Sequence, residues 1–332
     1  TLGDDMRQKS FSELEYGAKR KQTRRDRFLA EIEAITPWSE LVQVWDLYSP
    51  AGKRGRPPIG LERMLRMYFL QQWYSLADEA LEDAIYDSQA LRNFMGIDLA
   101  VESVPDATTL LKFRRLLEAN GLTKTLFEGI NAELSRRGLL LHEGTMVDAS
   151  IVAAPASTKN REKQRDPDMH QTRKGKQYYF GMKAHIGADV ESGLVHTVVA
   201  TAANEADVNQ TEHLLHGTEN VVFADAGYTG ADKREALKDK PIEWHVAMKR
   251  GKLKAMAEGR LKDLLTRRER LRAQIRSSVE HPFHVVKNLF GHRKVRYKGL
   301  AKNQAQLFTL FGLANLVIAK NELLGTCSQG AS

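Results

Sequence analysis

Two aspartates occupy positions where a carboxylate can do chemistry. Asp148 interrupts a short apolar run at 145–153, and a buried carboxylate is costly unless it has a partner or binds a metal ion. Asp225 ends the apolar run 221–224 and precedes a glycine-containing loop. Ligand sites in α/β sheets favour the carboxyl ends of strands, although an aspartate before glycine is also common in an ordinary turn.

Glu280 lies in a helical pattern together with Arg276 and Lys287. The three positions share one face of an ideal helix. Pro282 removes a backbone donor, so we expect the helix to kink or restart near His281. The prediction that Arg276 pairs with Glu280 is therefore stronger than the prediction that the helix continues to Lys287. The alternative is a surface ion pair, which contributes little to stability.

Taken together, Asp148, Asp225 and Glu280 predict a metal-dependent site for phosphodiester chemistry. Two of them lie on expected strands and one on a late helix, so all three are able to converge at one edge of a sheet. Hard oxygen ligands suit Mg²⁺, with Mn²⁺ as a substitute, rather than Zn²⁺. Two such ions, ~3.5–4 Å apart, activate a water or a 3′-hydroxyl and stabilise the leaving oxygen.

Basic side chains suited to a nucleic-acid backbone accompany these carboxylates. The 332 residues include 50 Lys and Arg against 42 Asp and Glu, and residues 249–276 alone have eleven against three. We expect that segment to contact DNA. Residues 19–27 hold six Lys and Arg and one Asp, which fits either a solvated arm or an arm that touches DNA.

The composition excludes several classes of protein. A single cysteine, Cys327, rules out an internal disulfide framework and a multi-cysteine zinc site. No apolar run reaches 18 residues, so no membrane span is predicted, and the basic N-terminus shows no secretory signal. We expect a soluble, cytoplasmic protein.

The elements that precede residue 140 are expected to be helical. Apolar residues at 61, 64, 65 and 68 have helical spacing, and Ser75 with Asp78 resembles a capping box. Asp106 is placed to cap a third helix that ends near Gly121. The other face of that helix carries Lys112, Arg114 and Arg115. This fits a DNA-binding unit of the helix-turn-helix kind or a packing domain with ordinary surface charge.

Beyond residue 144 the pattern changes to the period of two that is typical of strands. Strands are expected at 145–153, 180–190, 194–200, 221–224 and 242–248, the second and third forming a hairpin. Residues 156–176 form a long polar stretch, Asn204 with Asp207 is expected to cap a helix, and the chain is helical from Glu258. This order predicts a ribonuclease-H-like α/β domain, a mixed five-stranded sheet with flanking helices, after an all-helical N-terminal domain.

Three further features are weaker candidates. Lys183 and His185 face away from the apolar side of their expected strand, either toward DNA or the site or on an ordinary surface. His281 and His284 are a weak zinc site without further ligands. Trp244 could stack on a flipped base, but a tryptophan in a strand is more often part of the core.

The chain resembles bacterial insertion-sequence transposases of the IS-five type, which carry an Asp-Asp-Glu triad on a ribonuclease-H-like fold. The resemblance runs from about residue 10 to 320. Matching stretches include VPDATTLLKFRRLLE at 104–118, GTMVDASIVAAPASTKN at 144–160, FGMKAHIGADVESGL at 180–194, ADAGYTG at 224–230 and RSSVEHPFHVVKNLFG at 276–291.

The resemblance assigns the triad to Asp148, Asp225 and Glu280, which would hold two Mg²⁺ ions. It places Arg276 and Lys287 as supporting residues, whereas the tyrosine that the family has three residues before the arginine is Ala273 here. The implied function is that of a DNA transposase. It would bind terminal inverted repeats, cleave the element ends and join them to target DNA, as a homodimer or larger assembly associated with the bacterial nucleoid.

The expected organisation has four parts. They are a basic arm and linker at 1–58, a helical DNA-binding and multimerisation domain at 59–140, the catalytic domain at 141–325 and a flexible tail at 326–332. Two other functions stay open. A stand-alone ribonuclease-H-like nuclease would cut DNA without joining it, and a non-catalytic regulator derived from a transposase would bind DNA without cutting it.

Overall fold

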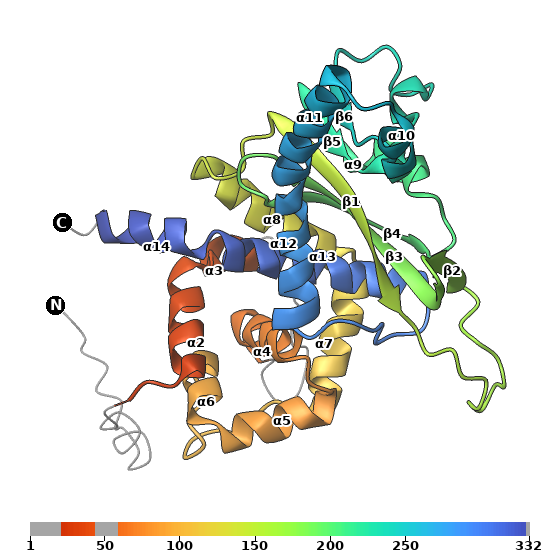
Figure 1. Cartoon of the computed structure of the whole chain (residues 1–332). Coiled ribbons are helices and arrows are strands. Elements are labelled where there is room, and N and C mark those ends of the chain that lie inside the picture. Colours follow the sequence, from red (N-terminus) through yellow and green to blue (C-terminus); the bar gives the residue numbers. More distant parts are fainter. Residues whose placement is uncertain (1–20, 44–58, 330–332) are drawn as a thin grey trace. The chain divides into compact units, whose positions relative to one another are not determined.

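The computed structural model describes residues 21–43 and 59–329 (Figure 1). The chain divides into two compact units, one of residues 1–120 with 320–332 and one of residues 121–319. The first part of the expected arm, 1–20, and the proline-containing linker at 51–58 lie outside the described residues.

The first unit is helical, as the sequence predicts. Its helices are α2 (Arg24–Ile35), α3 (Trp38–Gln43), α4 (Leu61–Tyr74), α5 (Asp78–Asp87), α6 (Gln89–Met95), α7 (Ala107–Ala119) and α14 (Lys320–Gln329). Aromatic residues form the centre of its core. Phe69 stacks on Trp38 and meets Trp73 edge to face, with ring centroids 5.5 and 5.6 Å apart.

Two of the three helix ends expected here are confirmed. The Asp106 carboxylate accepts a hydrogen bond from the Thr109 amide at 2.6 Å, and Gly121 takes a left-handed conformation directly after α7. The capping box at Ser75 is wrong. Ser75 instead ends α4 with a φ of 55°, and α5 starts after Ala77 without a side-chain cap, while the Asp78 carboxylate is bound by Arg114.

The second unit contains a six-stranded mixed sheet. Its strands are β1 (Gly144–Ala153), β2 (His170–Lys174), β3 (Gln177–Asp189), β4 (Val195–Ala202), β5 (Val221–Ala224) and β6 (Glu243–Val246). They follow the order β2-β3-β1-β5-β6, and β4 also pairs with β3. β1 is antiparallel to β3 and parallel to β5, as expected for a ribonuclease-H-like sheet.

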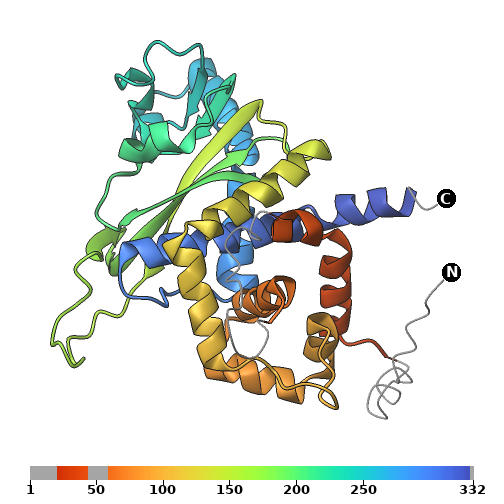
Figure 2. The ribbon, with the colours of Figure 1, turned by 180° about the vertical axis from the view of Figure 1, so that it is seen from behind.

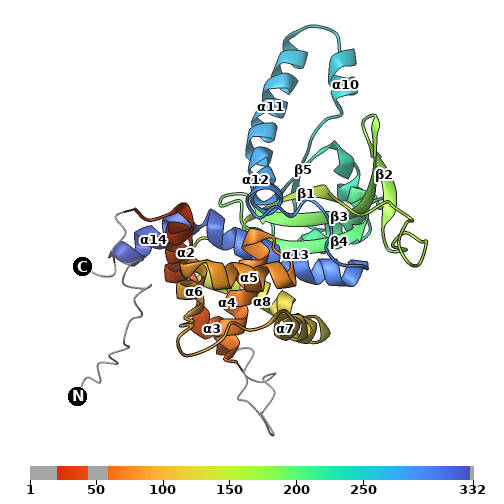
Figure 3. The ribbon, with the colours of Figure 1, turned by 90° about the horizontal axis from the view of Figure 1, so that it is seen from below.

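Helices cover this sheet. They are α8 (Leu122–Arg136), α9 (Thr211–Leu214), α10 (Arg250–Ala255), α11 (Arg260–Arg276), α12 (Glu280–His284) and α13 (Leu300–Ile318). α11 and α12 lie on the face seen in Figure 1, and α8 lies on the opposite face, seen in Figure 2. α10 and α11 pack side by side and project past the strands (Figure 3).

Short segments with 3₁₀ or π geometry complete the unit. The 3₁₀ segments are η2 (Asp207–Gln210), η3 (Ala226–Tyr228), η4 (Ala231–Lys233) and η5 (Ser277–Val279), and the π segment is η6 (Val285–Leu289). η2 replaces the start of the expected helix near Asn204. Its preceding residue is Ala206, which makes no side-chain cap.

Several sequence expectations about the sheet and its boundaries are wrong. The count of five strands is one short, because β2 is polar and exposed and so shows no apolar alternation. β3 is buried on both faces along most of its length, not on one. The boundary lies at 120/121 rather than 140, since α8 packs on α13 of the sheet unit.

The ends of the chain also differ from expectation. Residues 24–43, expected within an arm, form α2 and α3, with Leu29, Ile32 and Leu41 buried. Residues 326–329, expected in a flexible tail, continue α14, and 330–332 lie outside the described residues. α14 belongs to the helical unit, where Lys320 pairs with Glu31 at 2.6 Å.

Candidate active site

The parallel register of β1 and β5 places Asp148 beside Asp225. Val147 pairs with Ala224, which is the last pair of the ladder, and each aspartate is the next residue of its strand. β5 ends there, and the Asp225 carboxylate caps η3 by accepting the Gly227 amide at 2.7 Å. The two aspartates are therefore neighbours where the parallel pairing of β1 and β5 ends, at the carboxyl end of β5.

Glu280 comes to the same place from a broken helix. α11 ends at Arg276, η5 follows, and α12 starts at Glu280, as expected from Pro282 two residues later. The Arg276 guanidinium lies 3.5 Å from the carbonyl of Ala224, the residue before Asp225. Arg276 thus ties the end of α11 to the end of β5.

Lys287 fixes the far side of the same helical run. Its ammonium donates to the Ser150 hydroxyl at 2.7 Å and to the Ile151 carbonyl at 2.6 Å, both on β1. Burial lowers the pKa of Lys287, with Lys174 adding to the effect, while Glu280 and Asp148 oppose it. The lysine therefore lies within the field of two of the three carboxylates.

The pKa of Asp148 indicates that the three carboxylates lie near one another. Burial, together with the charges of Glu280 and Asp225, raises the pKa of Asp148 to about 7, although the Ala149 amide and Arg276 act to lower it. The carboxylates of Glu280 and Asp225 are therefore both close enough to disfavour ionisation of Asp148. A cation between them would relieve that cost.

Two features of the η3 loop leave room and polarity for a cation. The Tyr228 hydroxyl is buried and has no hydrogen-bond partner among the described residues. Gly227 leaves the space beside Asp225 open, because a Cβ there would lie 2.9 Å from the Asp225 Oδ1 atom. Carboxylate oxygens are the donors that Mg²⁺ and Mn²⁺ prefer, so the residues fit such an ion.

The carboxylates do not yet form a closed ligand set. Within residues 21–43 and 59–329, no three His, Cys, Asp or Glu side chains are grouped so that they could hold a metal ion. Glu280 is exposed, whereas Asp148 and Asp225 are half-buried. Side-chain movement, most readily of Glu280, would therefore accompany binding.

Lys183 and His185 are both candidates for a surface that approaches DNA, and the structure does not support both. The Lys183 ammonium is held by the Asp207 carboxylate at 2.8 Å and the Glu205 carbonyl at 2.7 Å. His185 is wholly buried and bonds to Thr201, and burial lowers its pKa to about 4. The prediction that His185 contacts DNA directly is therefore wrong.

The three basic residues of α7 also separate. Lys112 and Arg115 are exposed, as a DNA-contacting face requires. Arg114 is 7% exposed, and its guanidinium bonds to both Asp78 carboxylate oxygens, at 2.7 and 2.9 Å. Arg114 is a core ion pair of the helical unit, so its assignment as a DNA contact is wrong.

Trp244 belongs to the packing of the sheet, and His281 and His284 do not form a metal site within the described residues. Trp244 packs against the buried cluster that includes Val147 and Val222. His281 and His284 are exposed, and the His284 ring contacts Asn288. Neither histidine lies in a metal-ligand group of the described part of the chain.

Sequence reasoning missed two residues at the site, Asp207 and Tyr228. Both interact electrostatically around the triad, since the pKa of Tyr228 is raised by burial and by Asp207, Asp148 and Asp225. The signal for Tyr228 was its place directly after the glycine-containing ADAG of the 224–230 motif. Asp207 gave only the weaker signal of a helix cap.

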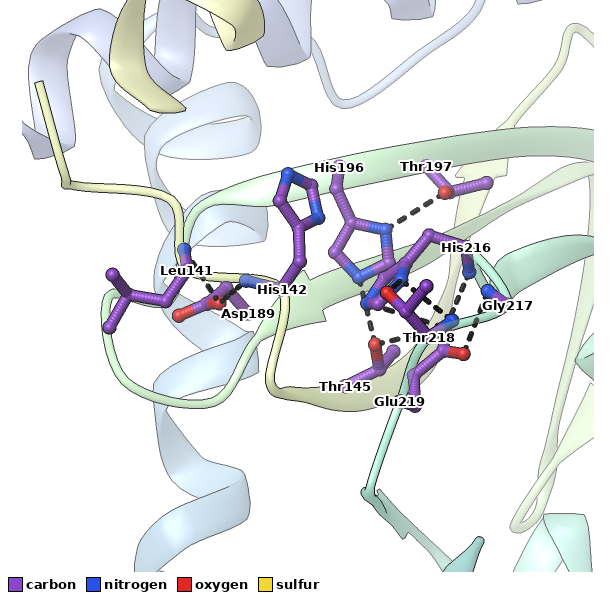
Figure 4. A network of polar contacts seen from close by, with 10 residues as sticks. All are labelled: Leu141, His142, Thr145, Asp189, His196, Thr197, His216, Gly217, Thr218 and Glu219. Atoms are coloured by element: carbon purple, nitrogen blue, oxygen red, sulfur yellow. Dashed lines mark hydrogen bonds and ion pairs between the residues drawn. The ribbon is translucent and has the colours of Figure 1, made fainter. Parts of the chain in front are cut away.

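A second polar network lies near the start of β1 (Figure 4). The rings of His142, His196 and His216 gather there, with centroids 4.9 to 5.9 Å apart. His196 bonds to Thr145 at 3.1 Å, and burial lowers its pKa to about 3. This network is separate from the triad, and burial lowers the pKa of both His196 and His216.

Comparison with known proteins gives two family matches. Residues 140–316, more than half of the chain, match the family model described as Transposase DDE domain. Residues 18–116 match the model described as Transposase domain. The first match spans all three carboxylates, and the second spans most of the helical unit.

One solved structure is also similar, the crystal structure of the Mos1 strand transfer complex. The two sequences are 15% identical, and the match covers 74% of this chain and 82% of that chain with a TM-score of 0.18. At that score the likeness carries no argument. Separately, none of the helices in the described part of the chain is long and apolar enough to cross a membrane.

Proposed function

Since the chain belongs to the family of transposase DDE domains, it is a DNA transposase of an insertion sequence, and we propose that Asp148, Asp225 and Glu280 are its catalytic triad. The observation that carries this assignment is the environment of Asp148. Its pKa is raised by burial, Glu280 and Asp225, so three carboxylates of different elements converge where a cation is needed.

Transposase domains of this family use divalent metal ions. We propose that Asp148, Asp225 and Glu280 hold two Mg²⁺ ions, with Mn²⁺ as a substitute. When bound, the ions would supply charge neutralisation and an activated oxygen nucleophile. The protein contributes position, since phosphoryl transfer depends on in-line geometry more than on covalent catalysis.

The reaction has two phosphoryl-transfer steps. In the first, water attacks a phosphodiester at the element end, the bond to the 3′-oxygen breaks, and a 3′-hydroxyl is released. In the second, that 3′-hydroxyl attacks a target phosphodiester and displaces a new 3′-oxygen. Both steps form and break one phosphorus–oxygen bond, so one set of carboxylates can serve both.

Arg276 and Lys287 support this site in the proposal. Arg276 lies against the end of β5, and its charge favours ionisation of Asp148. Lys287 holds η6 to β1. Either cation could contact a phosphate of bound DNA, and both hold the helical run that carries Glu280 to the sheet.

The DNA partners are the terminal inverted repeats of the element and the target. Exposed basic residues are available on both units: Lys112 and Arg115 on α7, and Arg267, Arg268 and Arg270 on α11. Because an element has two ends, we propose a homodimer or larger complex, acting on nucleoid DNA in the bacterial cytoplasm. The helical unit is our candidate for recognition of the ends.

A strand-transfer assay tests this function. A labelled element end that already carries a free 3′-hydroxyl is incubated with target DNA, Mg²⁺ and wild type or Asp148→Asn. Joined product with wild type alone is the expected result. Nicking of the target DNA without joining would favour a stand-alone nuclease, and DNA binding without either product would favour a non-catalytic regulator.

A further inference from the structure

Asp207 lies next to the triad although it belongs to a different segment. It is the first residue of η2, which follows β4. Its Oδ1 atom binds the Lys183 ammonium at 2.8 Å. Its side chain is 29% exposed, so it is neither a core residue nor a freely solvated one.

The second oxygen of Asp207 faces the loop after β5. The position of a Cβ on Gly227 would lie 3.6 Å from Asp207 Oδ2 and 2.9 Å from Asp225 Oδ1. The two carboxylate oxygens are therefore separated by no more than the sum of those distances. Gly227 keeps the space between them free of side-chain atoms, and one hydrated cation could reach both oxygens.

Tyr228 interacts with Asp207 and with two members of the triad, which is a second observation on the same region. Its hydroxyl is buried without a hydrogen-bond partner in the described part of the chain. Asp207 raises the pKa of Tyr228 more than Asp148 or Asp225 does, after burial itself. Asp207 thus adds negative charge to the same region as two members of the triad.

The ion pair with Lys183 does not explain why the second carboxylate oxygen of Asp207 faces the loop after β5. Lys183 is already held by the Glu205 carbonyl at 2.7 Å, and it uses only one oxygen of Asp207. The His185 ring also approaches the same oxygen at 3.9 Å, so Lys183 and His185 lie on one side of the carboxylate. The other oxygen remains directed at the open space beside Asp225.

We propose that Asp207 is a fourth carboxylate of the metal centre, a positioning residue that holds the hydration shell of the cation bound by Asp225. The Lys183 ammonium partly neutralises this carboxylate. The inference rests on the proposed function, because it presupposes a cation at Asp225. Residues that orient metal ligands from outside typically change metal affinity by roughly 10- to 100-fold when substituted.

The test measures Mn²⁺ binding to the full chain by electron paramagnetic resonance, in the absence of DNA. Asp207→Asn should weaken Mn²⁺ binding by roughly 10- to 100-fold, and the Mg²⁺ concentration for half-maximal end cleavage should rise with it. Unchanged Mn²⁺ affinity and Mg²⁺ requirement would overturn the proposal.

Lys183→Gln separates a direct effect of Asp207 from one transmitted through the lysine. Removing the positive charge should leave Mn²⁺ binding unchanged or strengthen it, because Asp207 is then less neutralised. If Lys183→Gln weakens binding as much as Asp207→Asn does, Asp207 acts only through the lysine and the proposal is wrong. Asp232→Asn, at an exposed position nearby in the chain, is the matched control and should bind as wild type does.

Two further variants keep the result interpretable. If Asp207→Asn does not fold, Gly227→Ala introduces a methyl group into the same space from the other side and should also weaken Mn²⁺ binding; unchanged binding there would equally overturn the proposal. Asp225→Asn reports on the proposed function alone. If it binds Mn²⁺ as wild type does, the triad assignment fails, whatever Asp207 does.

Discussion

Lys287 ties the segment that carries Glu280 to the central strand, because its ammonium lies 2.6 Å from the Ile151 carbonyl of β1. Lys287 is seven residues beyond Glu280, and Ile151 is three beyond Asp148. The bond therefore spans the two elements that supply the first and third carboxylates. It sets how far apart those elements lie.

Loss of this tie should impair chemistry more than DNA binding. Lys287→Met should slow end cleavage by roughly 100-fold, since a small displacement of a reacting group costs about that much. Single-turnover cleavage with saturating protein measures it. Ser150→Ala removes only one of the two acceptors of Lys287 and should have a much smaller effect. Wild-type cleavage by Lys287→Met would refute a positioning role.

Because Asp148 is buried, removing its charge should stabilise the metal-free protein. Folding raises the pKa of Asp148 to about 7 from 3.8, so the folded state binds its proton more tightly. Stability therefore falls as pH rises from about 4 to 7, and the full cost is present at pH 8.

At pH 8 with chelator, Asp148→Asn should raise the melting temperature by on the order of 5 °C. Added Mg²⁺ should stabilise wild type by mass action and leave the variant unchanged. Differential scanning calorimetry measures both. A lower melting temperature for Asp148→Asn in chelator would contradict this account of the site's electrostatics.

The histidine cluster should make the fold sensitive to acid. Burial lowers the pKa of His196 to about 3 from 6.5, with His216 and His142 adding to the effect. Between those two values the unfolded chain binds a proton that the folded chain does not. Stability is therefore lost as pH falls below 6.5, by at most about 1.4 kcal/mol per pH unit for one histidine.

Urea unfolding of wild type and His196→Gln at pH 7.0 and 5.0 measures this dependence. The difference in stability between the two pH values should be smaller in the variant. His213→Gln, at an exposed position, should keep the wild-type difference. An equal pH dependence in wild type and His196→Gln would show that His196 does not contribute.

The basic residues of α7 should divide into a structural one and two that bind DNA. Arg114→Ala breaks a buried ion pair with Asp78 and should destabilise the protein by about 3 kcal/mol. Exchanging exposed Lys112 and Arg115 for alanine should leave stability within about 0.5 kcal/mol. It should weaken binding to element ends and reduce the salt dependence of that binding.

Urea unfolding and binding titrations at two salt concentrations test this division. Unchanged affinity and salt dependence in the Lys112→Ala/Arg115→Ala variant would remove α7 from the DNA interface. Wild-type stability of Arg114→Ala would contradict its assignment to the core.

The sequence was sufficient to place the triad residues on their elements, because each lies in a local pattern. Asp148 and Asp225 follow apolar strand residues, and Pro282 indicates the helix break after which Glu280 lies. It could not show that Val147 pairs with Ala224. That register joins residues 77 positions apart and depends on the whole sheet.

The errors have the same physical origin. Alternation along β3 shows which side chains share a face, but not that the second face is covered as well. A Cβ at Gly187 would lie 2.2 Å from the Leu214 carbonyl of α9, so that face has no room for DNA at His185. Likewise, the partner of Arg114 is 36 residues away in Asp78, and only the folded helical unit brings them together.

The most direct test of the account is a metal titration of end nicking by four proteins: wild type, Asp148→Asn, Asp225→Asn and Glu280→Gln. Each is incubated with a labelled element end, with Mg²⁺ or Mn²⁺ varied, and DNA binding is measured in parallel. The account predicts metal-dependent nicking by wild type alone, with end binding retained in all four. Nicking at the wild-type rate by any one of the three variants would contradict a metal centre shared by these carboxylates.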